Sequence, residues 1–265
     1  MTVHDLEDLY QWTLCGWSPA LFPGYADQPV GQVVGFWKLD DAQQLKAFKP
    51  TAELKAFLAD GPTPIYVGWG SMLVKDATFM TVVAVEAAML ASSRAVVLGG
   101  WAQLNVDKLP KERADLIAYA KKNVHFATGS VPHGWLLPQC SAGVVHGGAG
   151  TVAAVVGAGI PCIVTPVLKC DQHFWGQRCN TLNVGVGLNK LLAQTSGADV
   201  AEALGKVDDT MRESARAKAK ALKAEDGVGT GAALLGEMAD NAKKAALLAR
   251  RPSMEEWEDG TPPVC

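Results

Sequence analysis

Residues 131–172 read VPHGWLLPQCSAGVVHGGAGTVAAVVGAGIPCIVTPVLKCDQ. No Asp, Glu, Lys or Arg occurs between Asn123 and Leu168. One apolar run, residues 142–145, precedes a group of glycines, and a second follows Gly159-Ile160-Pro161. Short apolar runs of this kind are typical of parallel strands that are covered on both faces. The segment therefore predicts two buried strands that flank a glycine-rich turn and a helix.

The glycine-rich turn, residues 146–151 (HGGAGT), has the chemistry of a phosphate site. Its glycines leave room for a ligand to approach the backbone, and the helix that follows presents N–H groups without a partner inside the helix. The helix dipole favours an anion at the same place, where His146 and the hydroxyl of Thr151 add hydrogen-bonding groups. The turn is not a P-loop, because no G-K-[ST] follows, and it is not a clean G-x-G-x-x-G fingerprint.

Strand and helix patterns alternate regularly from Pro64 to Leu188. The expected strands are residues 65–70, 95–98, 124–127, 142–145, the second apolar run and 185–188, and the expected helices include residues 77–91, 111–121 and 172–182. This alternation predicts an α/β fold, a Rossmann-like parallel sheet flanked by helices. Because ligands of such sheets bind beyond the carboxyl ends of the strands, one cleft should be lined by the turns after Val67, Leu98, Ala127, Val145 and Thr165.

Composition divides the chain into three parts. Residues 1–60 are expected to be a mostly irregular, interdomain-like segment, with a short helix at 51–58 that Thr51 caps and a strand within 31–37. Residues 61–250 form the Rossmann-like domain, whose end, from 198 onward, predicts two or three surface helices with a break near Asp226. Residues 251–265 are expected to be an extended tail.

Composition also excludes several classes of protein. The 265 residues are 49% hydrophobic and 19% charged, as in a soluble globular chain, and a formal charge of -3 gives no reason to expect nucleic acid. The six cysteines show neither a C-x-x-C pair nor zinc spacing, which indicates reduced thiols in the cytoplasm. No signal-peptide pattern follows Met1. Glycines and prolines interrupt the uncharged run 151–168, so a membrane span is not expected there.

Three motifs occur in a fixed order: VPHGWLLP at 131–138, HGGAGT at 146–151 and DQHFWG at 171–176. Two more, GFWKLD at 35–40 and PIYVGWGSM at 64–72, precede them. Together they resemble the C-terminal, donor-binding half of sterol 3β-glucosyltransferases, members of the UDP-glycosyltransferase superfamily with the GT-B fold. The resemblance covers residues 18–188.

The resemblance implies a site for a UDP-sugar. In that family the matching residues hold the uracil base, contact the diphosphate or grip the sugar hydroxyls. They are Ser130, Val131 and His133 for the base; Ser71, His146, Ala149, Gly150 and Thr151 for the phosphates; and Asp171 and Gln172 for the sugar.

The implied reaction is inverting transfer of a hexosyl group, with UDP-glucose as co-substrate and a sterol or other lipid hydroxyl as acceptor. Negative charge develops on the departing diphosphate, and amides, a helix dipole and an imidazole can stabilise it. We therefore expect no metal and no other cofactor. The expected location is the cytoplasm, and a lipid acceptor would let the protein lie peripherally on membranes.

The family's acceptor-binding half, with the histidine that deprotonates the acceptor, has no counterpart in residues 1–60. We assign no catalytic base, and His173, where the family usually has proline, is the only candidate within the chain. The acceptor site is expected in a missing N-terminal domain or a partner chain. The alternatives are the donor-binding subunit of a two-chain glycosyltransferase, a non-catalytic nucleotide-sugar-binding module, and a truncated gene product.

Structural roles compete with several of these assignments. His146 can be a core histidine bonded to a backbone carbonyl, and His133 can cap the short turn 134–137. Asp171 can N-cap the following helix, and Ser71 can be a turn residue. Four tryptophans, Trp69, Trp101, Trp135 and Trp175, are expected in the core or at domain contacts.

Overall fold

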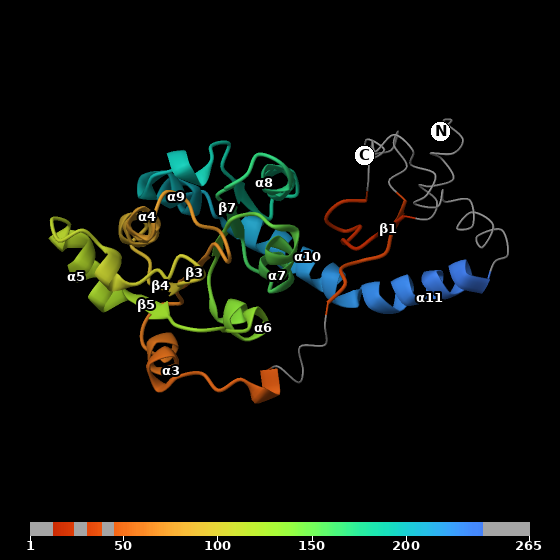
Figure 1. Cartoon of the computed structure of the whole chain (residues 1–265), viewed down its shortest axis with the longest axis horizontal. Helices are drawn as coiled ribbons and strands as arrows, with labels where there is room; N and C mark the ends of the chain where they lie inside the picture. The colour runs from red at the N-terminus through yellow and green to blue at the C-terminus, as the bar shows by residue number, and fades with distance from the viewer. Residues whose placement is uncertain (1–12, 24–30, 39–44, 241–265) are drawn as a thin grey trace, which may run out of the picture.

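The structure, a computed structural model, describes residues 13–23, 31–38 and 45–240. A six-stranded sheet runs in the order β5-β4-β3-β6-β7-β8, and each neighbouring pair is parallel (Figure 1). The strands are β3 (Ile65–Gly68), β4 (Ala95–Leu98), β5 (Val124–Ala127), β6 (Gly143–Val145), β7 (Cys162–Val164) and β8 (Gly185–Gly187). A separate parallel pair joins β1 (Leu14–Cys15) and β2 (Gln32–Val33). The expected α/β fold with a parallel sheet is confirmed.

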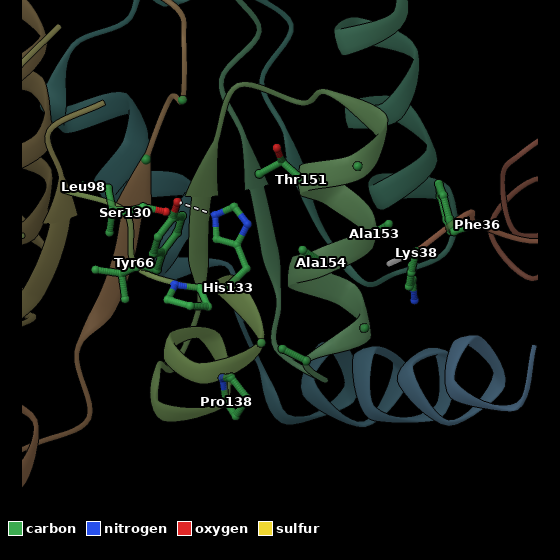
Figure 2. Close-up of a pocket in the computed structure, with 18 of the residues that line it drawn as sticks. Phe36, Lys38, Tyr66, Leu98, Ser130, His133, Pro138, Thr151, Ala153 and Ala154 are labelled. Atoms are coloured by element: carbon green, nitrogen blue, oxygen red, sulfur yellow. Dashed lines mark hydrogen bonds between the residues drawn. The ribbon is translucent and has the colours of Figure 1, made fainter. Parts of the chain in front are cut away.

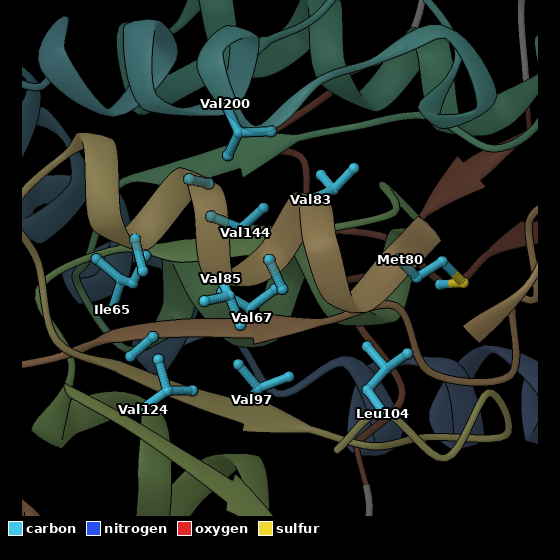
Figure 3. Close-up of a cluster of buried hydrophobic side chains, with 14 of the residues drawn as sticks. Ile65, Val67, Met80, Val83, Val85, Val97, Leu104, Val124, Val144 and Val200 are labelled. Carbon is cyan, nitrogen blue, oxygen red and sulfur yellow. The ribbon is translucent and has the colours of Figure 1, made fainter. Parts of the chain in front are cut away.

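Alternate strand residues feed two cores, one on each face of the sheet. On one face Val67, Val97 and Val144 pack with the buried sides of α4 (Ala77–Leu90) and α9 (Gly197–Gly205), as Figure 3 shows. Helix α5 (Ala114–Asn123) belongs to the same core. The other face carries Tyr66 and Val145. It packs against helices α3 (Ala52–Ala59), α6 (His133–Leu136), α7 (Ala149–Gly157), α8 (Asp171–Thr181) and α10 (Asp209–Ala224). Strands buried on both faces explain the uncharged runs of the sequence.

Strand order reverses at the middle of the sheet. From β3 the chain winds outward through β4 to β5, and from β6 it winds the other way through β7 to β8. The point between β3 and β6, where the direction changes, is where open parallel sheets form a ligand crevice. Residues 66–70 and the turn 146–151 meet at this point.

A chain of buried hydrogen bonds ties the carboxyl ends of three strands together. The indole Nε1 of Trp69, just after β3, donates to Thr165 Oγ1 at 2.7 Å. The Thr165 hydroxyl, just after β7, donates to the carbonyl oxygen of Val145 in β6 at 3.2 Å. Trp69 is 2% exposed and Thr165 is fully buried. The turns after β3, β6 and β7 are therefore held in one arrangement.

Most expected elements agree with the structure. Thr51 caps α3, with its side chain accepting from the amide of Leu54 at 3.2 Å. The break near Asp226 separates α10 from α11 (Gly227–Asp240). The strand expected within 31–37 is shorter, because β2 holds only Gln32 and Val33. The tail 251–265 lies outside the described residues, and the domain boundaries stay predictions.

The described residues also form three short 3₁₀ helices: η1 (Val106–Lys108), η2 (Leu137–Gln139) and η3 (Leu192–Gln194). Among the described residues no helix is both long and apolar enough to cross a bilayer.

Thr165→Val tests the buried link between the strand ends. Valine has nearly the same shape but leaves the Trp69 N–H without its acceptor, so we expect the free energy of unfolding to fall by about 1–3 kcal/mol. Thr81→Val is the matched control: Thr81 is equally buried, but its hydroxyl donates to the carbonyl of Ala77 one turn back, and no donor is left unpaired. Urea unfolding should show a clearly smaller loss for the control; equal losses would contradict the link.

Candidate functional site

A cavity of about 810 Å³ opens at the carboxyl ends of β3 and β4 and runs along the outer face of α7 (Figure 2). The expected turns after Val67, Leu98, Ala127 and Val145 all contribute to it, whereas the turn after Thr165 does not. It is lined by residues 36–38, Tyr66, Gly68, Gly70, Leu98, Gly100, residues 129–134, Pro138, Gly150, Thr151, Ala153, Ala154, Gly157, Ala158 and Lys223.

The first turn of α7 presents backbone donors to this cavity. Its N-cap residue, Gly148, has no side chain to cap the helix, and its carbonyl accepts from the amides of Thr151 and Val152, both at 3.0 Å. Helix geometry leaves the amides of Ala149 and Gly150 without a partner inside the helix. Gly150 and Thr151 line the cavity. The turn thus has the exposed N–H groups and the positive dipole end that favour an anion.

His146 lies beside this turn. A Cβ at Gly70 would sit 3.7 Å from its Cε1, and one at Gly148 would sit 2.6 Å from its Nε2, so the ring fills the space between the two glycines. Its Nδ1 is buried and has no hydrogen-bond partner among the described residues. The Nδ1 atom thus makes no hydrogen bond to a backbone carbonyl of the described residues, which argues against the alternative of a core histidine held in that way. Burial lowers the pKa of His146, and the charge of Asp171 opposes that shift.

The three residues expected to hold the uracil base lie together in the cavity wall formed by residues 129–134. Ser130, Val131 and His133 all line the cavity. His133 is the first residue of α6, whose N-cap is Pro132 without a side-chain hydrogen bond. The expectation that His133 only caps the turn is therefore wrong. Its Nε2 instead lies 3.0 Å from the hydroxyl oxygen of Tyr66.

The residues expected to grip the sugar lie outside the cavity lining. Gln172 is buried, and its Oε1 accepts from the amides of Val167 and Leu168 at 2.8 and 3.0 Å. Asp171 is exposed and begins α8; the N-cap is Cys170, and no side chain caps this helix. The expected N-cap role of Asp171 is therefore wrong. The carboxylate acts on the site through its charge near His146.

Three of the residues expected at the phosphates, His146, Ser71 and Ala149, also lie outside the lining, although Gly70 and Gly150, the neighbours of Ser71 and Ala149, belong to it. Among the tryptophans, Trp69 and Trp175 are buried as expected, but Trp101 is 80% exposed and belongs to no core. His173 does not line the cavity.

Several lining residues were not among the expected site residues. Phe36, Trp37 and Lys38 lie in the GFWKLD motif, and Lys223 lies in the last turn of α10. These segments are distant in sequence from the glycine turn, so only the fold brings them to it. Tyr66 had a local signal, since it is the one polar side chain in a buried strand.

No metal-binding cluster is evident in the described part of the chain: nowhere do three or more His, Cys, Asp or Glu side chains come together. The expectation that the site works without a metal stays a prediction.

A family comparison identifies the domain. The family described as "Erythromycin biosynthesis protein CIII-like, C-terminal domain" matches residues 87–229, which include the glycine turn and α7. The chain belongs to this family. The match covers β4 to α10, the part of the fold that builds most of the cavity.

The relatives of this EryCIII-like domain include sterol 3-beta-glucosyltransferases. One from Saccharomyces cerevisiae is 36% identical over 239 residues, 87% of the chain and 19% of that protein. One from Arabidopsis thaliana is 39% identical over 215 residues, 80% of the chain and 31% of that protein. The resemblance drawn from the motifs is confirmed, and the chain spans less than a third of either relative.

Two solved structures share the fold. A glycotransferase of kitacinnamycin superposes with a TM-score of 0.65 at 21% identity, covering 89% of the chain and 57% of that chain. The spinosyn rhamnosyltransferase SpnG gives 0.55 at 21% identity, covering 80% and 52%. Together they confirm the expected glycosyltransferase-type α/β domain.

Asp171→Asn tests the charge relation between α8 and the glycine turn. Because the carboxylate favours the protonated imidazole, its removal should lower the pKa of His146 further below the usual value. An NMR titration of the histidine ring signals measures this shift. Asp209→Asn, an exposed carboxylate in the first turn of α10, should leave it unchanged. A His146 pKa that stays the same or rises in Asp171→Asn would contradict the arrangement.

Proposed function

We propose that this EryCIII-like domain is the donor-binding part of a glucosyltransferase. It binds UDP-glucose and serves inverting transfer of glucose to the hydroxyl of a sterol or other lipid alcohol. The observation that carries the proposal is the cavity, which joins the uncapped first turn of α7 to the wall formed by residues 129–134. One end suits a diphosphate, and the other suits a planar base.

The chemistry follows from the charge that the reaction creates. Displacement at the anomeric carbon leaves negative charge on the diphosphate, and donors that are already oriented stabilise such charge most effectively. The amides of Ala149 and Gly150, the dipole of α7 and the hydroxyl of Thr151 supply these donors. His146, whose lowered pKa keeps it neutral at pH 7, can donate one N–H to the developing charge.

The sugar is assigned to the start of α8. The Oε1 atom of Gln172 is used by two backbone amides, so this side chain keeps only its NH₂ group for a sugar hydroxyl. Asp171 keeps its whole carboxylate at the exposed start of the helix. A carboxylate can accept from two adjacent hydroxyls at once. Asp171 is therefore the main sugar-binding residue of the proposal, and Gln172 chiefly holds the loop 167–168.

The acceptor and its base are assigned outside the cavity lining. An alcohol needs a positioned base, because its pKa lies far above 7. Of the two histidines at the site, His133 is engaged by Tyr66, and His146 lies at the phosphate turn. An acceptor-binding domain or a partner chain is the proposed source of the catalytic base. The relatives are much longer than the part that the chain matches, which is consistent with a further domain.

The proposed location is the cytoplasm. Cys140, Cys162 and Cys179 are buried, and none of them is part of a disulfide. A fold that keeps such thiols in its core suits a reducing compartment.

Calorimetry with UDP-glucose tests the proposed function. We expect saturable binding whose affinity is the same with magnesium and with EDTA, because the phosphate donors are amides and a helix dipole rather than a metal. Loss of binding in EDTA would contradict the metal-free site, and no binding in either buffer would contradict the proposal.

His146→Ala should weaken UDP binding by about 1–3 kcal/mol, roughly 5- to 150-fold, the usual effect of losing a hydrogen bond to a charged group. His125→Ala is the matched control, because this half-buried histidine of β5 packs on Phe57 of α3, and two strands separate β5 from β6, the strand that leads into the glycine turn. Unchanged UDP affinity in His146→Ala, together with a lower melting temperature, would show that the ring is only structural.

A further inference from the structure

Three large apolar side chains are exposed in loops at the carboxyl edge of the sheet. Leu73 follows β3, Trp101 follows β4 and Leu168 follows β7, and they are 61%, 80% and 52% exposed. A single exposed apolar residue is ordinary, but a group at one edge calls for an explanation. The described residues expose four other large apolar side chains, and none of these lies in a loop that follows a strand of the six-stranded sheet: Trp37, Leu90, Val228 and Leu235.

Trp101 is held out of the core by a tight turn. Its amide donates to the carbonyl oxygen of Gly70 at 3.1 Å, and the amide of Leu104 donates to the carbonyl oxygen of Gly99 at 3.1 Å. Ala102 and Leu104, in the same turn, are buried in the core on that face of the sheet. The turn thus buries two smaller apolar side chains and leaves the indole, its largest, in water. Backbone hydrogen bonds therefore fix the exposure of Trp101.

Gln172 joins the loop after β3 to the loop after β7. Its Nε2 lies 3.9 Å from the sulfur of Met72, and Leu73 is the next residue along that loop. Its Oε1 accepts from the amide of Leu168 at 3.0 Å. Because the loop after β4 is bonded to Gly70 in the same way, the three loops that carry the exposed side chains are all linked at one region of the sheet edge.

This region borders the place assigned to the donor sugar. Gly70 and Gly100, next to the exposed side chains in sequence, line the cavity. Asp171, the main sugar-binding residue of the proposed function, follows Leu168 by three residues and begins α8. An acceptor hydroxyl can attack the anomeric carbon only when it is held against the sugar. The carbon skeleton that carries this hydroxyl therefore lies against the same edge.

We propose that Leu73, Trp101 and Leu168, together called the apolar rim, bind the apolar body of the acceptor alcohol. The inference rests on the proposed function and gives this chain a part in acceptor binding, while the base still comes from elsewhere. Apolar side chains gain free energy when an apolar molecule removes them from water, and they gain little from a polar acceptor such as a sugar. The face of an indole also suits a flat ring system. The rim therefore favours an alcohol with a large apolar skeleton.

Photolabelling with a sterol that carries a diazirine on its ring system tests the rim. The full chain is irradiated with this probe in the presence of UDP, below saturation, and the labelled peptides are identified by mass spectrometry. We expect label in residues 71–75, 99–105 and 166–170. Trp101→Ser should reduce the label in 71–75 and 166–170 about 10-fold, the effect of losing the burial of one large apolar side chain. Leu73→Ser should reduce the label in 99–105 to a similar extent.

Leu90→Ser is the matched control. Leu90 is 53% exposed, but it is the last residue of α4 and lies shortly before β4 begins, at the amino edge of the sheet. The same loss of an exposed leucine should leave the label at the rim unchanged. All three substitutions replace exposed side chains, so urea unfolding should give the same midpoint for each variant as for the wild type.

Several results would overturn the role of the rim. They are label confined to α11, which also exposes Val228 and Leu235, and label at the rim that does not fall in Trp101→Ser. Binding to phosphatidylcholine vesicles without sterol that is lost in Trp101→Ser would show that the rim contacts a lipid surface instead. UDP binding in calorimetry without label at the rim would contradict the rim alone. Label at the rim without UDP binding would support the rim and contradict the proposed function.

Discussion

The buried hydrogen bonds from Trp69 to Thr165 and from Thr165 to the carbonyl of Val145 are the constraint on which the site depends. They join the ends of β3, β6 and β7. Gly70 follows Trp69 after β3, and His146 follows Val145 at the end of β6. The distance from the imidazole to the turn after β3 is therefore set by the sheet. Two polar side chains without exposure to water can be tolerated here only because they satisfy each other. The donors of the glycine turn are held in place by this packing, so they need no rearrangement when a ligand's charge develops.

The same packing explains why the phosphate turn is made of glycine. Gly147 has a φ of +95°, and a Cβ there would lie 2.6 Å from Val164 and 2.8 Å from the carbonyl oxygen of Gln172. The starts of α7 and α8 can therefore approach each other closely. Gln172 then holds the loop after β7 through two amides, which places Asp171 near enough to act on the pKa of His146. Phosphate and sugar positions are thus coupled through backbone packing.

Sequence patterns predicted the sheet well because buried parallel strands leave an uncharged, β-branched signature that little else produces. They also predicted that Ser130, His133, Gly150 and Thr151 share one cavity, since each follows the end of a strand. Lys38, Lys223 and the Tyr66–His133 contact were out of reach, because they depend on how distant segments pack. Helices α6 and α8 each begin one residue earlier than the sequence predicted. His133 and Asp171 are therefore the first residues of their helices and not their caps. Trp101 was predicted to be buried because tryptophan is a large apolar residue, and the sequence alone does not show that this one lies in an exposed loop.

The central claim is that the first turn of α7 holds the diphosphate of a UDP-sugar. A crystal structure of the chain with UDP tests it most directly. We expect phosphate oxygens within hydrogen-bond distance of the amides of Ala149 or Gly150 and of the His146 ring, with the uracil base against residues 130–133. Phosphates bound elsewhere in the cavity, or a base lying at the glycine turn, would contradict it.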